Sequence, residues 1–224
     1  MMGLKGRGLL ITFEGIEGSG KTTQLKRLAA ALKKQRYPVV STHEPGGTPL
    51  GEKIRTLLVH SKTKISPETE LFLFVSDRSN HVRNVIIPSL QKKQMVLCDR
   101  FTDSTIAYQA FGRSLSQKLL DGMNKLATGG LKPDITFFLD LPVQAGLRRA
   151  KSRGALNRLD RESSTFYARV RKGYYFLARK NSRIVIIDGS QSAEAIHAQI
   201  LQKVNMLLSK FGQASSSNGR NRSK

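Results

Sequence analysis

Short runs of consecutive apolar residues recur along the chain, and between them apolar residues return at every third or fourth position. Consecutive apolar residues are typical of strands in a parallel sheet that is covered on both faces. Five runs show this pattern: 9–14 (LLITFE), 39–43 (VVSTH), 95–98 (MVLC), 135–140 (ITFFLD) and 184–188 (IVIID). The pattern predicts a parallel sheet of five buried strands.

The stretches between these runs predict helices. A helix over 21–35 is indicated by apolar residues at steps of three and four, namely Leu25, Leu28, Ala29 and Leu32. A long helix over 67–90 is expected to begin with Ser66 as its cap and Pro67 in its first turn. Further helices are predicted over 116–127, 143–153, 163–181 and 193–211. Alternating strands and helices define an α/β doubly wound fold, whose ligands bind beyond the carboxyl ends of the strands.

Length and composition favour one globular domain. The 224 residues are 39% hydrophobic and 24% charged, an ordinary globular profile. The single cysteine excludes an intrachain disulfide, and no apolar run approaches the roughly 20 residues that span a bilayer. We expect a cytoplasmic protein without a secretory signal or a membrane contact. One domain should cover 1–211, and 212–224 should form a disordered basic tail.

The net charge is strongly positive. Lysine and arginine number 38 against 16 acidic residues, which gives +22. Such a field attracts polyanions, including nucleic acid and nucleotide phosphates. Composition alone leaves open whether the charge serves nucleic-acid binding or reflects a solvated basic surface.

Residues 15–22 (GIEGSGKT) match the phosphate-loop pattern G-x-x-x-x-G-K-[ST], directly after the first strand and at the start of the first helix. Glycines let backbone N–H groups surround phosphate oxygens at a helix N-terminus. Lys21 can reach the terminal phosphates, and the Thr22 hydroxyl suits Mg²⁺. Glu17 is a carboxylate among phosphates and suggests an acceptor for a sugar hydroxyl. The residues expected to bind ATP are Gly15, Ile16, Glu17, Gly18, Ser19, Gly20, Lys21, Thr22 and Thr23.

Other segments favour a small kinase. No N-K-x-D segment, which reads guanine in GTPases, is present. EPGGT (44–48) follows the second strand, and DRF (99–101) follows the third. Phe74 and Arg78 lie four residues apart, hence on one face of the predicted long helix.

An ordered set of segments resembles the thymidylate kinase family from Leu9 to about Met206. The segments are FEGIEGSGKTT, EPGGT, EKIRTLL, the helix with Phe74 and Arg78, DRFTDSTIAYQ, KPDITFFLDL and RGALNRLDRES. The resemblance implies a P-loop nucleoside-monophosphate-kinase fold with a lid at about 149–162. It also implies a homodimer that phosphorylates dTMP to dTDP with ATP and Mg²⁺, a step in the supply of dTTP for DNA replication.

The resemblance also implies roles for individual residues. Phe74 would stack on thymine, although core packing is its alternative; Tyr108 would crowd the sugar's 2′ position. Arg55 and Arg100 would hold the monophosphate, and Glu17 would accept from the 3′-hydroxyl. The implied substrate-binding residues are Glu17, Glu44, Pro45, Gly46, Arg55, Phe74, Arg78, Arg100, Ser104, Thr105, Tyr108 and Gln109. Thr22 and Asp99 would hold the metal.

One branch of the family has an arginine in the phosphate loop, where this chain has Gly18. The resemblance therefore implies that the lid supplies the catalytic cations. The implied catalytic residues are Lys21, Asp99, Arg100, Arg153 and Arg158. For Asp140, at the end of the fourth strand, a structural or helix-capping role is preferred over metal binding.

Two other functions remain open at this point. One is another nucleoside or nucleotide kinase of the same superfamily. The other is a nucleic-acid-binding P-loop ATPase, which only the net charge of +22 favours. The sequence does not decide between dTMP and dUMP, which differ by one methyl group worth about 1–3 kcal/mol.

Overall fold

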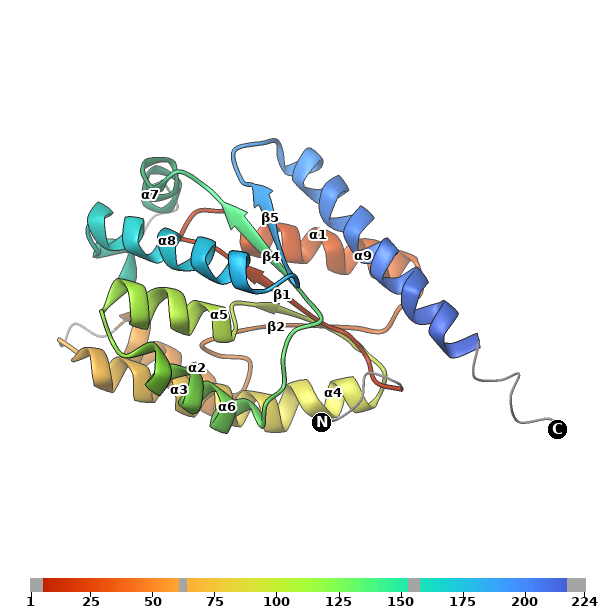
Figure 1. The fold of residues 1–224 in the computed structure, drawn as a ribbon, viewed down its shortest axis with the longest axis horizontal. Helices are drawn as coiled ribbons and strands as arrows, with labels where there is room; N and C mark the ends of the chain where they lie inside the picture. Colours follow the sequence, from red (N-terminus) through yellow and green to blue (C-terminus); the bar gives the residue numbers. More distant parts are fainter. Residues whose placement is uncertain (1–5, 61–63, 153–157, 217–224) are drawn as a thin grey trace.

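The computed structural model describes residues 6–60, 64–152 and 158–216. Its core is a five-stranded sheet with all neighbouring strands parallel (Figure 1). The strands are β1 (Leu10–Glu14), β2 (Val39–His43), β3 (Met95–Asp99), β4 (Ile135–Asp140) and β5 (Ile184–Asp188). The five predicted strands are confirmed, each to within one residue at either end.

The order of the strands is β2-β3-β1-β4-β5, so β1 lies at the centre. Its residues are fully buried, as the run of apolar residues predicts. The prediction that all five strands are buried is wrong for the edges. In β2 and β5 several side chains are half-buried or exposed, because each has a neighbour on one side only.

Nine α-helices flank the sheet within the described residues. They are α1 (Lys21–Lys34), α2 (Pro49–Arg55), α3 (Pro67–His81), α4 (Ile87–Gln91), α5 (Thr102–Thr105), α6 (Gln117–Thr128), α7 (Val143–Lys151), α8 (Ser164–Lys180) and α9 (Ala193–Ser216). None of the described helices is both long enough and apolar enough to cross a membrane.

Three helical features differ from the predictions. The predicted 67–90 helix is divided into α3 and α4 by a π-helical stretch, Val82–Ile86. The short helices α2 and α5, each continued by π-helical turns, were not predicted. Helix α9 continues to Ser216, past the predicted start of the tail at 212, because a helix that is already packed extends at little cost. Residues 217–224 lie outside the described residues.

The helices form one layer on each face of the sheet. Helices α1 and α9 cover one face (Figure 1), and the buried Leu28 and Ile200 pack there with Phe13 of β1. The opposite face is covered by α3 to α6 and α8, where Phe138 of β4 packs among Tyr174 and its neighbours. This arrangement leaves the carboxyl ends of β1 and β3 adjacent, since Phe13 pairs with Asp99.

Candidate active site

The phosphate loop connects β1 to α1 and is built on glycines. Gly15, Gly18 and Gly20 have φ values of 140°, 73° and 94°, which side chains disfavour. Gly20 caps α1 without any side-chain hydrogen bond. The first N–H groups of the helix therefore remain available to an anion, and the helix dipole favours negative charge there.

The side chain of Lys21 contacts the backbone of this loop. Its Nζ donates to the carbonyl oxygens of Gly15 and Ile16 at 3.1 and 2.8 Å. The side chain is buried, and burial together with nearby Arg100 lowers the pKa of Lys21 to about 8. The ammonium form still predominates at neutral pH, so Lys21 presents a cation beside the loop.

A cavity of about 640 Å³ opens where the loop meets the carboxyl ends of the strands. Most of the predicted site residues line it, although they come from five separate parts of the chain. They are Glu17, Gly18, Lys21, Thr22, Glu44, Pro45, Arg55, Phe74, Arg78, Asp99, Arg100, Ser104, Thr105, Tyr108 and Gln109. Gly15, Ile16, Ser19, Gly20, Thr23 and Gly46 are not among the residues that line it.

Thr22 and Asp99 meet at the wall of this cavity. The Thr22 hydroxyl donates to Oδ2 of Asp99 at 2.5 Å, which joins the first turn of α1 to the end of β3. A hydroxyl and a carboxylate are hard oxygen ligands, and Mg²⁺ takes one or two such protein ligands alongside substrate phosphates. The two side chains therefore fit the predicted metal site.

Glu17, Arg100 and Tyr108 form a second cluster in the cavity. Oε1 of Glu17 accepts from Nη2 of Arg100 at 2.8 Å, and Oε2 accepts from the Tyr108 hydroxyl at 2.6 Å. Burial alone would raise the pKa of Glu17, but the charges of Arg100 and Lys21 lower it. The guanidinium of Arg100 also lies 4.9 Å from the centre of the Tyr108 ring. Glu17 is thus an ionised acceptor held in one place.

Arg78 is the largest fully buried side chain among the described residues, and each of its three side-chain nitrogens donates to the protein. Nε donates to Glu44 at 2.8 Å, and Nη2 donates to the carbonyl oxygen of Phe101 at 3.0 Å. Nη1 donates to Thr105 and Asn124 at 2.6 and 2.7 Å. Arg78 also lines the cavity, so its expected contact with the base or the monophosphate stays a prediction.

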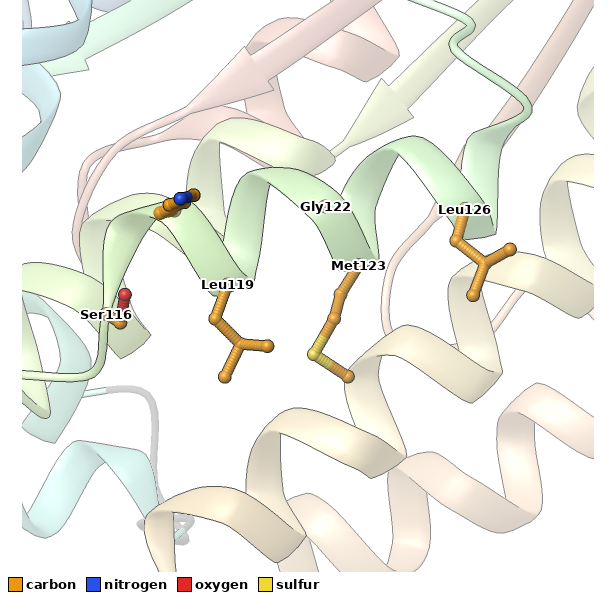
Figure 2. A pocket seen from close by; sticks show the side chains of 6 residues that line it. Ser116, Leu119, Gly122, Met123 and Leu126 are labelled. Carbon is orange, nitrogen blue, oxygen red and sulfur yellow. The ribbon is translucent and has the colours of Figure 1, made fainter.

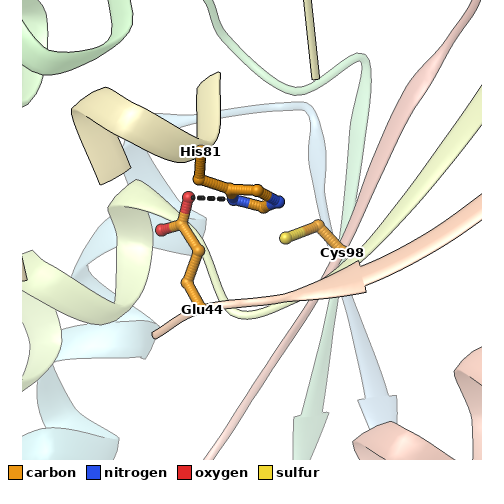
Figure 3. Close-up of side chains that lie close together, drawn as sticks. All are labelled: Glu44, His81 and Cys98. Atoms are coloured by element: carbon orange, nitrogen blue, oxygen red, sulfur yellow. Dashed lines mark hydrogen bonds and ion pairs between the residues drawn. The ribbon is translucent and has the colours of Figure 1, made fainter. Parts of the chain in front are cut away.

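Glu44, His81 and Cys98 lie close together (Figure 3). Oε1 of Glu44 is 3.0 Å from Nδ1 of His81, and Nε2 of the same ring is 2.6 Å from the Thr42 hydroxyl. Cys98 is buried and burial raises its pKa well above the usual value, so it is an inert core thiol. Because both imidazole nitrogens are already hydrogen-bonded, the three side chains form a buried network rather than an open metal centre.

The EPGG turn is held by carboxylates from two helices. The Gly46 N–H donates to Oδ1 of Asp77 at 3.1 Å, and the Gly47 N–H donates to Glu52 at 3.0 Å. Arg55 donates to the Pro45 carbonyl at 2.9 Å. Burial and the nearby Glu44 charge raise the pKa of Asp77 to about 7, and its Oδ2 has no partner among the described residues. Sequence reasoning missed Asp77, since nothing marks it within a helical pattern.

The described part of the lid places Arg158 against Glu70 and the Leu58 carbonyl. Its Nη2 donates to Oε2 of Glu70 at 2.5 Å, and its Nε donates to the Leu58 carbonyl at 2.8 Å. Arg153 lies outside the described residues. Arg149 of α7 was not predicted, yet it lies at the loop: a Cβ added to Gly18 would be 3.1 Å from that of Arg149.

Asp140 has a structural role, as preferred, but it does not cap a helix. Its two oxygens accept from Nε and Nη2 of Arg171 at 2.6 and 2.8 Å, and Tyr175 donates to Oδ2 at 2.6 Å. The residue that caps α7 is Pro142. Asp140 therefore joins β4 to α8 and is not among the residues that line the cavity.

A phosphate loop on a parallel sheet, with a carboxylate and arginines across the cavity, defines a P-loop nucleotide kinase. Residues 13–200 match the model of the thymidylate kinase family. The thymidylate kinase of Kosmotoga olearia is 44% identical over 205 residues, 91% of this chain and 99% of that protein. That of Carboxydothermus hydrogenoformans is 46% identical over 194 residues, 87% and 95% of the two chains.

A solved structure agrees with these relatives. The crystal structure of thymidylate kinase from Ehrlichia chaffeensis has a TM-score of 0.73 and 38% identity. The likeness covers 88% of this chain and 98% of that one. The chain belongs to the thymidylate kinase family, and it is a phosphotransferase of the nucleoside monophosphate kinase class. The family and the fold predicted from the sequence are both confirmed.

Proposed function

We propose that this chain transfers the γ-phosphoryl group of ATP to dTMP, giving ADP and dTDP. One observation carries the proposal: a single cavity is lined both by the phosphate loop and by Arg100 and Tyr108, which donate to Glu17 of that loop. A phosphate oxygen of dTMP forms the new bond to γ-phosphorus as the bond to the ADP oxygen breaks. That oxygen is already ionised at neutral pH, so catalysis needs positioning and charge stabilisation rather than a strong base.

The donor half of the reaction belongs to the loop. Its N–H groups surround the β- and γ-phosphates, and Lys21 turns from the carbonyls of Gly15 and Ile16 toward them. Thr22 and Asp99 would hold Mg²⁺, which would neutralise charge on the phosphates.

The acceptor half lies across the cavity. Arg100 and Arg55 pair with the monophosphate, and Glu17 accepts a hydrogen bond from the 3′-hydroxyl. The Tyr108 ring, fixed by its bond to Glu17, leaves little space at the 2′ position and favours deoxyribose.

The base lies between the remaining cavity residues. Phe74 is half-buried and lines the cavity, so its ring is available to stack on thymine. Ser104, Thr105 and Gln109 come from the helical segment after β3 and line the same wall. Their hydroxyl and amide groups suit the edge of the pyrimidine.

The lid supplies the remaining positive charge. Arg153, Arg158 or both move to the transferred phosphoryl group, and an arginine in such a position is worth on the order of 10³–10⁵ in rate. Arg153→Ala or Arg158→Ala should therefore lower kcat at least about 100-fold. The exposed Arg161, from the same segment, gives a matched control: Arg161→Ala should keep kcat near that of the wild type. If all three variants keep wild-type kcat, the lid arginines have no catalytic role.

We also propose that the chain acts in the cytoplasm as a homodimer. Leu119, Met123 and Leu126 extend from the same side of α6, and they line an apolar groove (Figure 2). Leu126 is 76% exposed, and Phe72 of the adjoining α3 is 58% exposed. A second copy related by a two-fold axis would cover such a stripe. Sedimentation of the wild type and of Leu126→Glu tests this: only the variant should be monomeric, and a monomeric wild type would contradict it.

The activity is tested by measuring ADP formation from ATP and Mg²⁺. The acceptors dTMP, dUMP, dCMP, dAMP, dGMP and thymidine are offered one at a time. The proposal predicts strong turnover with dTMP, weaker turnover with dUMP and almost none with the others. Turnover with thymidine but not with dTMP would identify a nucleoside kinase instead. Stimulation by DNA or RNA alone, with steep loss at higher salt, would identify a nucleic-acid-dependent ATPase.

A further inference from the structure

Glu70 is a buried carboxylate at the start of α3, and it contacts both the base side of the cavity and the lid. Its side chain is 1% exposed. Oε1 accepts from Nε2 of Gln109 at 2.8 Å and from Nε of Arg113 at 3.2 Å. Oε2 accepts from Nη2 of Arg113 at 3.1 Å and from Arg158 at 2.5 Å. The proposed phosphoryl transfer does not use this carboxylate.

Glu70 is ionised at neutral pH. Burial alone would raise its pKa, but the hydrogen bonds and charges of Arg113 and Arg158 outweigh burial and lower it. An ionised carboxylate only accepts hydrogen bonds. Gln109 must therefore turn its NH₂ group toward Glu70, and the amide is fixed in that orientation.

Fixing the NH₂ group determines which group Gln109 offers to a ligand. Gln109 lines the cavity, and its nitrogen is bound by Glu70. Glu70 takes one of the two amide hydrogens, and the amide oxygen is the only acceptor that the Gln109 side chain can offer to the pyrimidine. Thymine carries a hydrogen on N3 and can donate to such an oxygen. Cytosine has a lone pair at N3, which the oxygen repels.

We propose that Glu70 is a positioning residue that orients the Gln109 amide, and that this orientation makes the cavity select pyrimidines with a hydrogen on N3. The inference rests on the proposed function, because it deepens the recognition of dTMP at the same site. It adds that selection against dCMP depends on a carboxylate outside the lining of the cavity, which the two bonds from Arg113 hold in place even when Arg158 moves to the phosphoryl group.

A purely structural role is the alternative. Arg113 also pairs with Glu162 at 2.6 Å and lies 4.6 Å from the centre of the Phe166 ring, so this cluster joins α3 to the segment before α8. Glu162 therefore provides a matched control. It binds the same arginine as Glu70, whereas the Gln109 amide nitrogen donates to Glu70.

The experiment compares wild type, Glu70→Gln and Glu162→Gln. The amide introduced by Glu70→Gln keeps the shape of the carboxylate, but it can donate or accept, so the Gln109 amide becomes free to turn over. Calorimetry gives the dissociation constants of dTMP and dCMP for each protein. The selectivity ratio, the Kd of dCMP divided by the Kd of dTMP, should fall about tenfold in Glu70→Gln, as expected for one oriented hydrogen bond in a dry site. It should stay within about twofold of wild type in Glu162→Gln, and ATP affinity should change little in either variant.

Three outcomes would overturn the inference. The first is an unchanged ratio in folded Glu70→Gln, and the second is an equal fall in Glu162→Gln. If Glu70→Gln does not fold, Glu70→Asp replaces it, because the shorter side chain draws the carboxylate away from Gln109. The third outcome is an unchanged ratio in Glu70→Asp or failure of both variants to fold, and either result leaves Glu70 a structural residue only. Wild-type turnover of dTMP is measured alongside. If the wild type is inactive on dTMP the proposed function fails, whereas active wild type with an unchanged ratio refutes this inference alone.

Discussion

Replacing Arg78 by methionine removes the cation at the centre of a buried polar network. The side chains of Arg78 and Glu44 are each 2% exposed, and their ion pair is 2.8 Å long. Arg78→Met fills similar space but donates nothing. Glu44 would keep its bond to His81 and lose its counter-charge, while Asn124 and the Phe101 carbonyl would each lose a donor.

The expected loss follows from burial. Removing one partner of a buried ion pair costs about 3–5 kcal/mol, because the remaining charge stays uncompensated in the protein interior. In a domain of this size each kcal/mol lowers the melting temperature by about 2–4 °C. Arg78→Met should therefore melt about 6–20 °C below the wild type, with a matching loss in the free energy of unfolding.

An exposed ion pair of nearly the same length provides the control. Arg27 and Glu194 are 2.7 Å apart, but their side chains are 38% and 73% exposed. Water already solvates both charges there, so Arg27→Met should melt within about 2 °C of the wild type. Urea unfolding and thermal melting of the three proteins measure the difference. Equal, small shifts in both variants would refute the argument that burial makes Arg78 indispensable.

Two further predictions concern Asp77 and Gly18. Burial and Glu44 raise the pKa of Asp77 to about 7, so the native state binds a proton that the unfolded chain releases near pH 4. The free energy of unfolding should fall as pH rises from about 4 to about 7, by up to about 1.4 kcal/mol per pH unit. Asp77→Asn should remove the part of this fall that Asp77 causes, and urea unfolding should show the variant about 1–3 kcal/mol more stable than wild type at pH 8. Gly18→Ala should lower kcat/KM for ATP at least about tenfold, because its Cβ would lie 2.3 Å from the Gly146 carbonyl oxygen.

Each of these predictions has a clear contradiction and a control. The prediction is contradicted if Asp77→Asn is less stable than wild type at pH 8 and equally stable at pH 5. Asp121→Asn, at an exposed position, is the control and should leave the free energy of unfolding unchanged at both pH values. Glu14, whose pKa burial and Asp103 also raise to about 7, will leave part of the pH dependence in place. For Gly18, the control is Gly129→Ala: Gly129 also has a positive φ of 62°, but open space surrounds it. Equal kinetics for Gly18→Ala and wild type would show that the close approach is not required.

The sequence predicted best what is determined locally. The five strands follow from runs of apolar residues, and the phosphate loop follows from glycine spacing between a strand and a helix. Short helices were missed, because α2 has seven residues and α5 has four, too few to show a helical period. The difference between central and edge strands depends on strand order, which appears only when all five strands are assembled.

The sequence predicted most of the residues that line the cavity, but not the hydrogen bonds between them. Which side chains line the cavity follows from motifs near strand ends, and most were identified in advance. Their partners lie far along the chain: Arg100 binds Glu17 across 83 positions, and Arg158 binds Glu70 across 88. A single sequence carries no signal for such contacts, so it did not show that the three side-chain nitrogens of Arg78 donate to the protein or that Glu70 accepts from Gln109.

Gly18 has a steric role that its position in the phosphate loop did not indicate. Its lack of a side chain suggested that the positive charge at the γ-phosphate comes from elsewhere. The structure adds a steric cause: Gly146 of α7 lies so close that a Cβ on either glycine would meet the backbone of the opposite segment, at 2.3 or 2.7 Å. The same contact brings Arg149, one turn further along α7, beside the loop. The missing side chain at position 18 and the position of Arg149, whose Nη1 donates to the Gly189 carbonyl at 3.2 Å, are therefore two consequences of one close packing between loop and helix.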